Sequence, residues 1–117
     1  MDSLGLANRI AEVLVDKQAA AISILDLHEV SVIADYFVIS SASSHRQLDA
    51  LGYAVREALK QETPPRQLGH NIEGTPESEW MLLDYGDVVV HLFTAEMRAF
   101  YRLEELWNKA RTVAQIQ

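Results

Sequence analysis

Two apolar runs joined by a short turn motif constrain this chain more than any other stretch. The first run begins at Trp80, the second ends at Phe93, and Asp84-Tyr85-Gly86-Asp87 lies between them. Glycine adopts the positive φ that a tight turn requires, and aspartate is common in turns. The pattern therefore predicts a β-hairpin with Tyr85-Gly86 at its tip and strands over about 79–84 and 87–93.

This predicted hairpin has two different faces, because side chains alternate across a strand. With Tyr85-Gly86 at the tip, Trp80 would pair with His91 and Leu83 with Val88. One face is wholly apolar and carries Met81, Leu83, Val88, Val90 and Leu92. The other face mixes polar and apolar side chains and carries Trp80, Leu82, Asp84, Asp87, Val89, His91 and Phe93. We expect the first face to belong to the core, and the second to be covered by a helix or left open for a partner.

The segments before the hairpin predict two helices and at least two further strands. Amphipathic spacing indicates helices over 4–19 and about 44–61, and Ser44 with Gln47 forms a capping pattern at the start of the second. Runs that favour β-structure predict strands over 22–27 and 35–40, with a short strand near 67–70.

After the hairpin, the sequence predicts one more helix. Thr94 can cap it, and one apolar face carries Met97, Phe100, Leu103 and Trp107. Residues 111–117 are expected to fray. The order of elements indicates an α/β (α+β-like) fold, in which a mixed β-sheet of about five strands is flanked by helices in a single domain over 1–117.

Composition excludes several classes of function. The chain has no cysteine, hence no disulfide and no thiolate site, and its net charge of −7 argues against nucleic-acid binding, including direct DNA binding. No apolar run approaches the roughly 20 residues that span a membrane, and the first residues lack the pattern of a signal peptide. We expect a cytoplasmic protein that makes no membrane contact.

The negative charge is concentrated around the hairpin. No lysine or arginine occurs from Gln67 through Met97, whereas this stretch carries Glu73, Glu77, Glu79, Asp84, Asp87 and Glu96. Such an acidic region can steer a basic partner, or it can be a solvated edge that keeps the protein in solution. The charge pattern leaves both interpretations open.

Asp84 and Asp87 are the most enzyme-like pair in the sequence. Two carboxylates can hold Mg²⁺ or divide the roles of acid and base, as in a small magnesium-dependent nucleotidyltransferase or phosphohydrolase. However, aspartates that flank a turn glycine are ordinary hairpin residues. The four histidines are scattered without ligand spacing, and the acidic stretch contains no basic residue to hold a phosphate. We therefore expect no metal, no cofactor and no catalytic residues.

Several segments together resemble the ribosomal silencing factor family, known as RsfS or Iojap. The segments that carry the resemblance are 34–40, 43–47, 73–74, 80–93 and 98–107. They cover nearly the whole chain in the order and spacing of the family. The resemblance implies a fold akin to nucleotidyltransferases without their catalytic carboxylates, and therefore a protein that is not an enzyme.

The resemblance also implies a partner. Proteins of this family bind the large ribosomal subunit through its protein fourteen, block joining of the small subunit and repress translation when nutrients are limited. The implied contact residues in this sequence are Trp80, Asp84, Tyr85, Asp87 and His91, followed by Glu73, Arg98 and Tyr101. Trp80 would be the anchor, the two aspartates would pair with basic side chains of the partner, and Tyr85 would add an aromatic contact.

Two questions about the hairpin remain open in the sequence. Trp80 lies at a strand end among polar residues, where a large aromatic side chain belongs either to the core or to an interface. The second hairpin face is apolar enough that we expect a weak homodimer away from the ribosome, unless a helix of the same chain covers that face.

Overall fold

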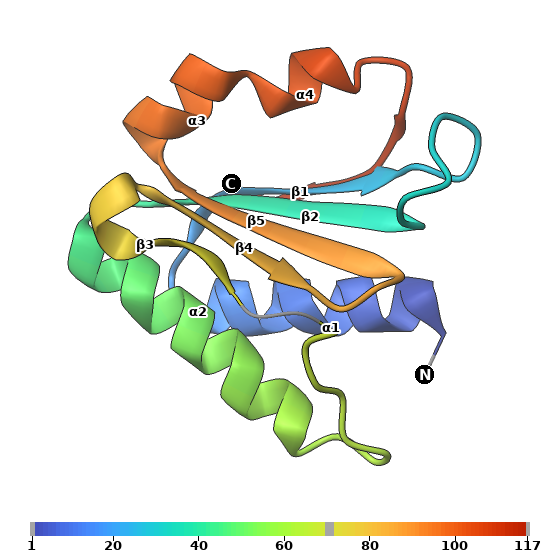
Figure 1. Ribbon diagram of the computed structural model, residues 1–117, viewed down its shortest axis with the longest axis horizontal. Coiled ribbons are helices and arrows are strands. Elements are labelled where there is room, and N and C mark those ends of the chain that lie inside the picture. Colours follow the sequence, from blue (N-terminus) through green and yellow to red (C-terminus); the bar gives the residue numbers. More distant parts are fainter. Residues whose placement is uncertain (1, 70–71, 117) are drawn as a thin grey trace.

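A mixed β-sheet lies between two pairs of helices in this protein (Figure 1). The computed structural model describes residues 2–69 and 72–116. In chain order the elements are α1 (Ser3–Asp16), β1 (Ala20–Asp26), β2 (Tyr36–Ala42), α2 (His45–Lys60), β3 (Glu73–Thr75), the 3₁₀ helix η1 (Pro76–Ser78), β4 (Trp80–Asp84), β5 (Val88–Thr94), α3 (Ala95–Tyr101), α4 (Leu103–Leu106) and β6 (Arg111–Ile116). No helix within the described ranges is both long and apolar enough to cross a membrane.

The strands of the described residues form one six-stranded sheet in the order β3-β4-β5-β2-β1-β6. The central pair, β2 and β5, is parallel, and every other neighbouring pair is antiparallel. The predicted fold class, a mixed sheet flanked by helices, is confirmed, with six strands rather than about five. All seven residues of β2 and of β5 are buried, which explains why both sequences are nearly continuous apolar runs.

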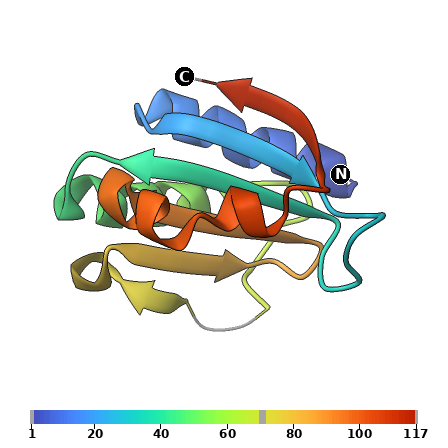
Figure 2. The same ribbon diagram turned by 90° about the horizontal axis from the view of Figure 1, so that it is seen from above.

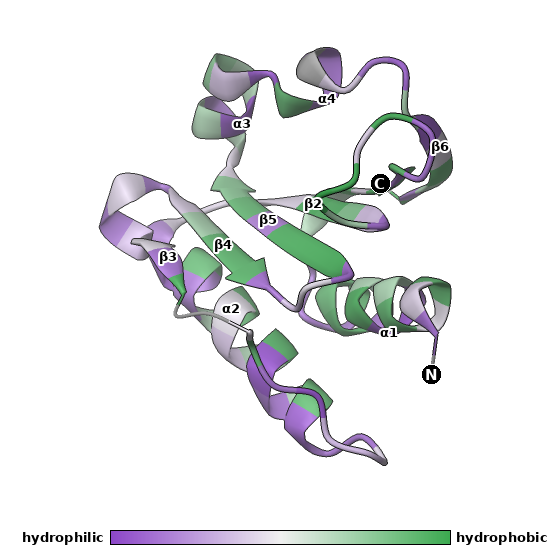
Figure 3. Ribbon diagram, turned by 45° about the vertical axis from the view of Figure 1, so that its right-hand side comes forward, coloured by the Kyte–Doolittle hydropathy of each residue, from purple (hydrophilic) through white to green (hydrophobic). Residues whose placement is uncertain are grey.

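Helices α1 and α2 cover the first face of the sheet. Their buried stripes are those that the spacing predicts, Leu6, Ile10, Val13 and Leu14 in α1 and Leu48, Leu51, Val55 and Leu59 in α2. The N-terminus of α2 is capped as expected, because the Gln47 backbone N–H donates to the Ser44 hydroxyl at 3.0 Å. The apolar hairpin face of Met81, Leu83, Val88, Val90 and Leu92 lies in the same core, and Figure 3 shows how hydrophobic β4 and β5 are.

The hairpin register differs from the predicted one by two residues. Trp80 pairs with Phe93 rather than with His91, and the tip is Gly86-Asp87 rather than Tyr85-Gly86. Tyr85 continues the ladder, since its N–H donates to the Val88 carbonyl at 2.9 Å, and the Asp84 carboxylate accepts from the Gly86 N–H at 2.7 Å. Gly86 has a φ of 91°, which suits glycine. A shift of two residues leaves every strand side chain on its predicted face.

The last predicted helix is interrupted, which the spacing did not indicate. Arg102 adopts a left-handed conformation with a φ of 51° and separates α3 from α4. Met97, Leu103 and Trp107 still pack against the second face of the sheet, because the bend redirects the chain along it. Phe100 does not pack there and is 76% exposed, so its assignment to the same buried face was wrong.

The predicted frayed tail is a strand over most of its length. Residues 111–116 form β6, which pairs antiparallel with β1 from Ile22–Ile116 to Asp26–Arg111. This pairing satisfies the outer edge of β1, which would otherwise expose a row of free N–H and C=O groups, and Val113 and Ala114 pack against the core. The short strand expected near 67–70 is not formed by residues 67–69, which lie in a loop, and residue 70 lies outside the described residues. The short strand before the hairpin is instead β3, which forms one edge of the sheet.

Candidate partner-binding surface

The second face of the sheet is only partly covered. Figure 2 shows α3 and α4 lying over β5 and β2, while β4 and β3 extend beyond them. Beneath these helices lies a second apolar cluster that includes Phe37, Ile39, Val89 and Phe93. The two alternatives for this face therefore each apply to a part of it: helices of the same chain cover its centre, and the β3–β4 edge is left open.

We name this open edge the β4 surface and define it by Glu73, Trp80, Leu82, Asp84 and Tyr101. The first four share one face of the sheet, because Glu73 pairs with Leu82 and side chains alternate along β4. Glu73 and Tyr101 are exposed, whereas Trp80, Leu82 and Asp84 are half-buried. The surface thus combines two aromatic rings and an apolar side chain with two carboxylates.

Three aromatic rings lie close to the ring of Trp80. Its ring centroid lies 5.7 Å from that of Tyr101, 6.1 Å from that of Phe93 and 6.3 Å from that of His91. The indole N–H donates to the Nδ1 atom of His91 at a long 3.4 Å. These contacts fix the orientation of Trp80 on the second apolar cluster, while part of the ring remains open to solvent.

His91 is buried next to Trp80 and does not face the solvent. It is 5% exposed, and its ring centroid lies 4.7 Å from that of Phe37. Burial lowers the pKa of His91 to about 4, so the imidazole is neutral at neutral pH. The Nε2 atom has no hydrogen-bond partner among residues 2–69 and 72–116.

The buried imidazole makes stability depend on pH. The folded-state pKa lies below the ordinary value of 6.5, so unfolding takes up a proton as pH falls below that value, and stability present at neutral pH is lost toward pH 4. Between about pH 7.5 and about pH 5 we expect this group alone to cost about 2 kcal/mol of unfolding free energy. His91→Phe should remove that loss in urea titrations at the two pH values.

The control for this prediction is His45→Gln, since His45 is an exposed histidine on α2. His28 acts in the opposite direction, because the Asp26 carboxylate raises the pKa of its imidazole, so the parent and the variants are compared by difference. An equally steep loss of stability in His91→Phe and in the parent would contradict the assignment.

Two other residues that were predicted to contact a partner, Tyr85 and Asp87, make contacts within the protein. Tyr85 is buried on the first face of the sheet, where burial raises the pKa of its hydroxyl to about 12. Asp87 forms an ion pair with Arg66 at 2.8 Å between its Oδ1 atom and Nη2. The absence of a basic residue from the acidic stretch was therefore misleading, because folding brings Arg66 to Asp87 from outside that stretch.

These contacts also bear on the enzyme interpretation. The Asp84 carboxylate accepts from the turn at Gly86 and the Asp87 carboxylate pairs with Arg66, so each already has a partner within the protein. In the described part of the chain, no group of three or more histidine, cysteine, aspartate or glutamate side chains is arranged to hold a metal ion.

The Arg98 side chain makes its hydrogen bonds within the protein. Its guanidinium donates to the Glu104 carboxylate through Nε at 3.0 Å, to the Ser41 hydroxyl at 3.0 Å and to the Ala21 carbonyl. It thereby ties α3 to β1 and β2 and spans the break between α3 and α4. Phe100, which sequence reasoning placed in the core, instead lies exposed beside Tyr101, with ring centroids 5.4 Å apart, and extends the aromatic part of the β4 surface.

Comparisons with known proteins place the chain in the class of ribosome-associated regulators of translation. Residues 1–117 match the sequence profile of the family described as ribosomal silencing factor during starvation, RsfS. The chain belongs to the ribosomal silencing factor family. This confirms the resemblance on which the sequence interpretation rests, and the names of the relatives denote regulators rather than catalysts.

Individual relatives cover most of the chain. It is 40% identical over 105 residues to the ribosomal silencing factor RsfS of Zymomonas mobilis, which covers 88% of this chain and 75% of the relative. It is 33% identical over 113 residues to the chloroplastic protein Iojap of Arabidopsis thaliana, covering 96% of this chain and 45% of the relative. A crystal structure of a protein from Chromobacterium violaceum matches the fold with a TM-score of 0.85 at 30% identity, covering 92% of this chain and 88% of that one.

Proposed function

We propose that this protein binds the large ribosomal subunit through its protein fourteen, blocks joining of the small subunit and thereby represses translation when nutrients are limited. The observation that carries the proposal is the match of residues 1–117 to a family described as silencing factors during starvation. Because the bacterial relatives are named ribosomal silencing factor RsfS, we propose that this action takes place in the cytoplasm.

The choice of the large subunit is supported by a mouse relative. The chain is 36% identical over 74 residues to a protein named for mitochondrial assembly of the ribosomal large subunit, covering 63% of this chain and 32% of that relative. A silencing factor that occupies the joining face of the large subunit needs no catalytic residues, because it acts by excluding a competitor.

The β4 surface is the contact region that we propose. Trp80 and Tyr101 provide aromatic anchors whose orientations are already fixed, which limits the entropy lost on binding. Glu73 and Asp84 beside them supply negative charge complementary to a basic ribosomal protein. Tyr85, Asp87, His91 and Arg98 support the fold around this surface and are not among the contacts we propose.

Charge steering by this surface can be tested at Glu73. This side chain is exposed on the edge strand, so Glu73→Lys should slow association with large subunits and reduce the dependence of the association rate on ionic strength. Asp87→Lys would be less informative, because it would also break the ion pair with Arg66. Association rates on immobilised large subunits at two ionic strengths provide the measurement.

Asp49→Lys is the matched control for this charge reversal, since Asp49 is exposed on α2, which covers the opposite face of the sheet. Identical salt dependence in Glu73→Lys and Asp49→Lys would remove the β3–β4 edge from the proposed interface.

We also propose a weak homodimer through the same surface in the absence of ribosomes, because its aromatic part is exposed there. Sedimentation equilibrium should show a mass that rises with protein concentration, and this rise should be lost in Trp80→Ala. A constant monomeric mass at high concentration contradicts the homodimer and leaves ribosome binding unaffected.

An order-of-addition assay tests the blocking step itself. Large subunits incubated with the protein before small subunits are added should yield fewer joined ribosomes on a sucrose gradient than untreated subunits. Adding the protein after joining should have a smaller effect. An unchanged yield of joined ribosomes with the protein added first would contradict the proposed mechanism.

A further inference from the structure

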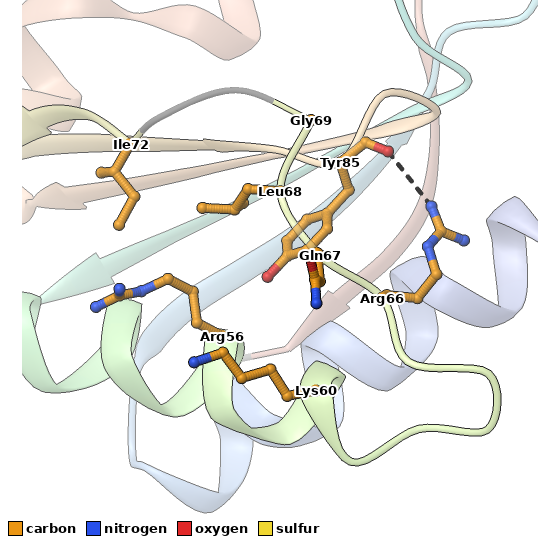
Figure 4. Close-up of a pocket in the computed structure, with 8 residues that line it drawn as sticks. All are labelled: Arg56, Lys60, Arg66, Gln67, Leu68, Gly69, Ile72 and Tyr85. Carbon is orange, nitrogen blue, oxygen red and sulfur yellow. Dashed lines mark hydrogen bonds between the residues drawn. The ribbon is translucent and has the colours of Figure 1, made fainter.

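A pocket opens on the side of the sheet away from the β4 surface. It has a volume of about 770 Å³ and lies between the C-terminal half of α2 and residues 66–69, with Tyr85 at its base (Figure 4). This volume falls within the range of roughly 300–1,000 Å³ that is usual for small-molecule sites. The proposed ribosomal contact does not use this pocket.

Basic side chains gather at this pocket although the protein as a whole is acidic. Arg56 and Lys60 are four residues apart on α2 and therefore extend from the same side of the helix (Figure 4). Arg56 bonds its own helix at the Gly52 carbonyl, and it makes no ion pair with any carboxylate of the described residues. Lys60 has one carboxylate partner, Glu57, at 3.0 Å.

A third basic residue, Arg66, lines the pocket but is already engaged. Its guanidinium turns away from α2 and donates to the Tyr85 carbonyl at 3.3 Å (Figure 4). It also donates to the Asp87 carboxylate at 2.8 Å. It therefore fixes the wall that Tyr85 forms. The charge available to a ligand comes chiefly from Arg56 and Lys60.

Tyr85 contributes both a donor and an apolar surface. Figure 4 shows its hydroxyl pointing toward α2, the helix from which Arg56 and Lys60 extend. A tyrosine hydroxyl is protonated at neutral pH, and burial raises the pKa of this one further, to about 12, so it can donate to an anion. Leu68 and Ile72 line the pocket on the loop side and add an apolar surface beside the tyrosine ring.

We propose that this pocket binds a nucleoside phosphate, with its phosphoryl groups at Arg56 and Lys60 and its base against Leu68, Ile72 and the ring of Tyr85. Arginine forms two parallel hydrogen bonds with a phosphate, lysine adds a mobile positive charge, and the tyrosine hydroxyl supplies a further donor. The apolar side chains account for a ligand larger than inorganic phosphate. A long nucleic acid fits less well, because the net charge of −7 repels a polyanion outside the pocket.

Calorimetric titration of the full chain with ADP and with GDP tests the proposal. We expect saturable binding of at least one of them, and at least tenfold weaker binding by the double variant Arg56→Gln, Lys60→Gln. The matched control is Lys109→Gln, which removes an exposed positive charge at another site and should leave binding unchanged. Tyr85→Phe, which keeps the ring and removes the hydroxyl, should weaken binding several-fold.

Three further titrations identify the chemistry of the ligand. Adenosine and guanosine should bind more weakly than the diphosphates, and pyrophosphate should also bind more weakly because it lacks a base. Citrate binding as tight as that of ADP would overturn the assignment to phosphate. Absence of saturable binding of both diphosphates at millimolar concentration, or equal binding by the parent and a folded double variant, would overturn the site.

Failure of the nucleotide-binding proposal can be distinguished from failure of the ribosome-binding proposal. The double variant should still bind large ribosomal subunits as the parent does, since Arg56 and Lys60 lie on the α2 side of the sheet. Loss of nucleotide binding together with retained subunit binding is the expected pair of results.

Discussion

Replacing Trp80 with alanine is expected to weaken binding to isolated large ribosomal subunits by about 2 kcal/mol or more, roughly 30-fold in the dissociation constant. The ring is half-buried at the open edge of the sheet and is oriented by Tyr101, Phe93 and His91. The loss should appear mostly as faster dissociation, and it should change little with salt because the contact that is removed is apolar. Association and dissociation rates on immobilised subunits at two ionic strengths provide the measurement.

This variant needs a folding control, because Trp80 also packs on the second apolar cluster and its truncation lowers stability to some extent. A circular dichroism melt establishes the temperature range in which the variant is folded, and binding is measured there. Tyr53→Ala is the matched control, since Tyr53 is an aromatic residue 59% exposed on α2, on the other side of the sheet. Parent-like binding by a folded Trp80→Ala variant would show that the contact lies elsewhere.

Arg98→Met is expected to lower the free energy of unfolding by about 3 kcal/mol, because removing one partner from a buried ionic network leaves the others unsatisfied. The Arg98 side chain is 12% exposed and serves the Glu104 carboxylate, the Ser41 hydroxyl and the Ala21 carbonyl. Its loss should loosen α3 and α4 from the sheet. Urea denaturation followed by circular dichroism measures the change.

Arg102→Met is the control for this prediction. Arg102 is 70% exposed and pairs only loosely with Glu105, at 3.7 Å, so its replacement should change stability by no more than about 0.5 kcal/mol. Equal losses in the two variants would mean that Arg98 is not an internal tie, and it would then return to the set of candidate contacts.

Local patterns predicted most of the fold, because most of the elements bury a periodic apolar stripe. The stripes of α1 and α2 and the two faces of the hairpin depend only on residue spacing. Strand β6 could not be found in this way, because its residues are mostly exposed or half-buried and it is stabilised by the free edge of β1. The break between α3 and α4, where Arg102 adopts a φ of 51°, likewise has no counterpart in the apolar spacing, which runs through it.

The candidate surface was predictable to the extent that strand alternation determines it. Trp80, Leu82 and Asp84 lie together because they share one face of the predicted strand β4. Glu73 joins them through β3, a strand that the sequence patterns did not predict. Tyr85 was misplaced because the hairpin tip lies one residue later than the turn motif suggested, which keeps Tyr85 in the alternation of the strand. The partner of Asp87 was missed because Arg66 lies 21 residues earlier in the chain.

The central claim is that the chain binds the large ribosomal subunit, and sedimentation with separated subunits tests it most directly. Purified protein is mixed with isolated large or small subunits and spun through a sucrose cushion, and the pelleted protein is compared with a sample without ribosomes. We predict recovery with large subunits and background levels with small ones. Equal recovery with both subunits, or background levels with both, would contradict the claim.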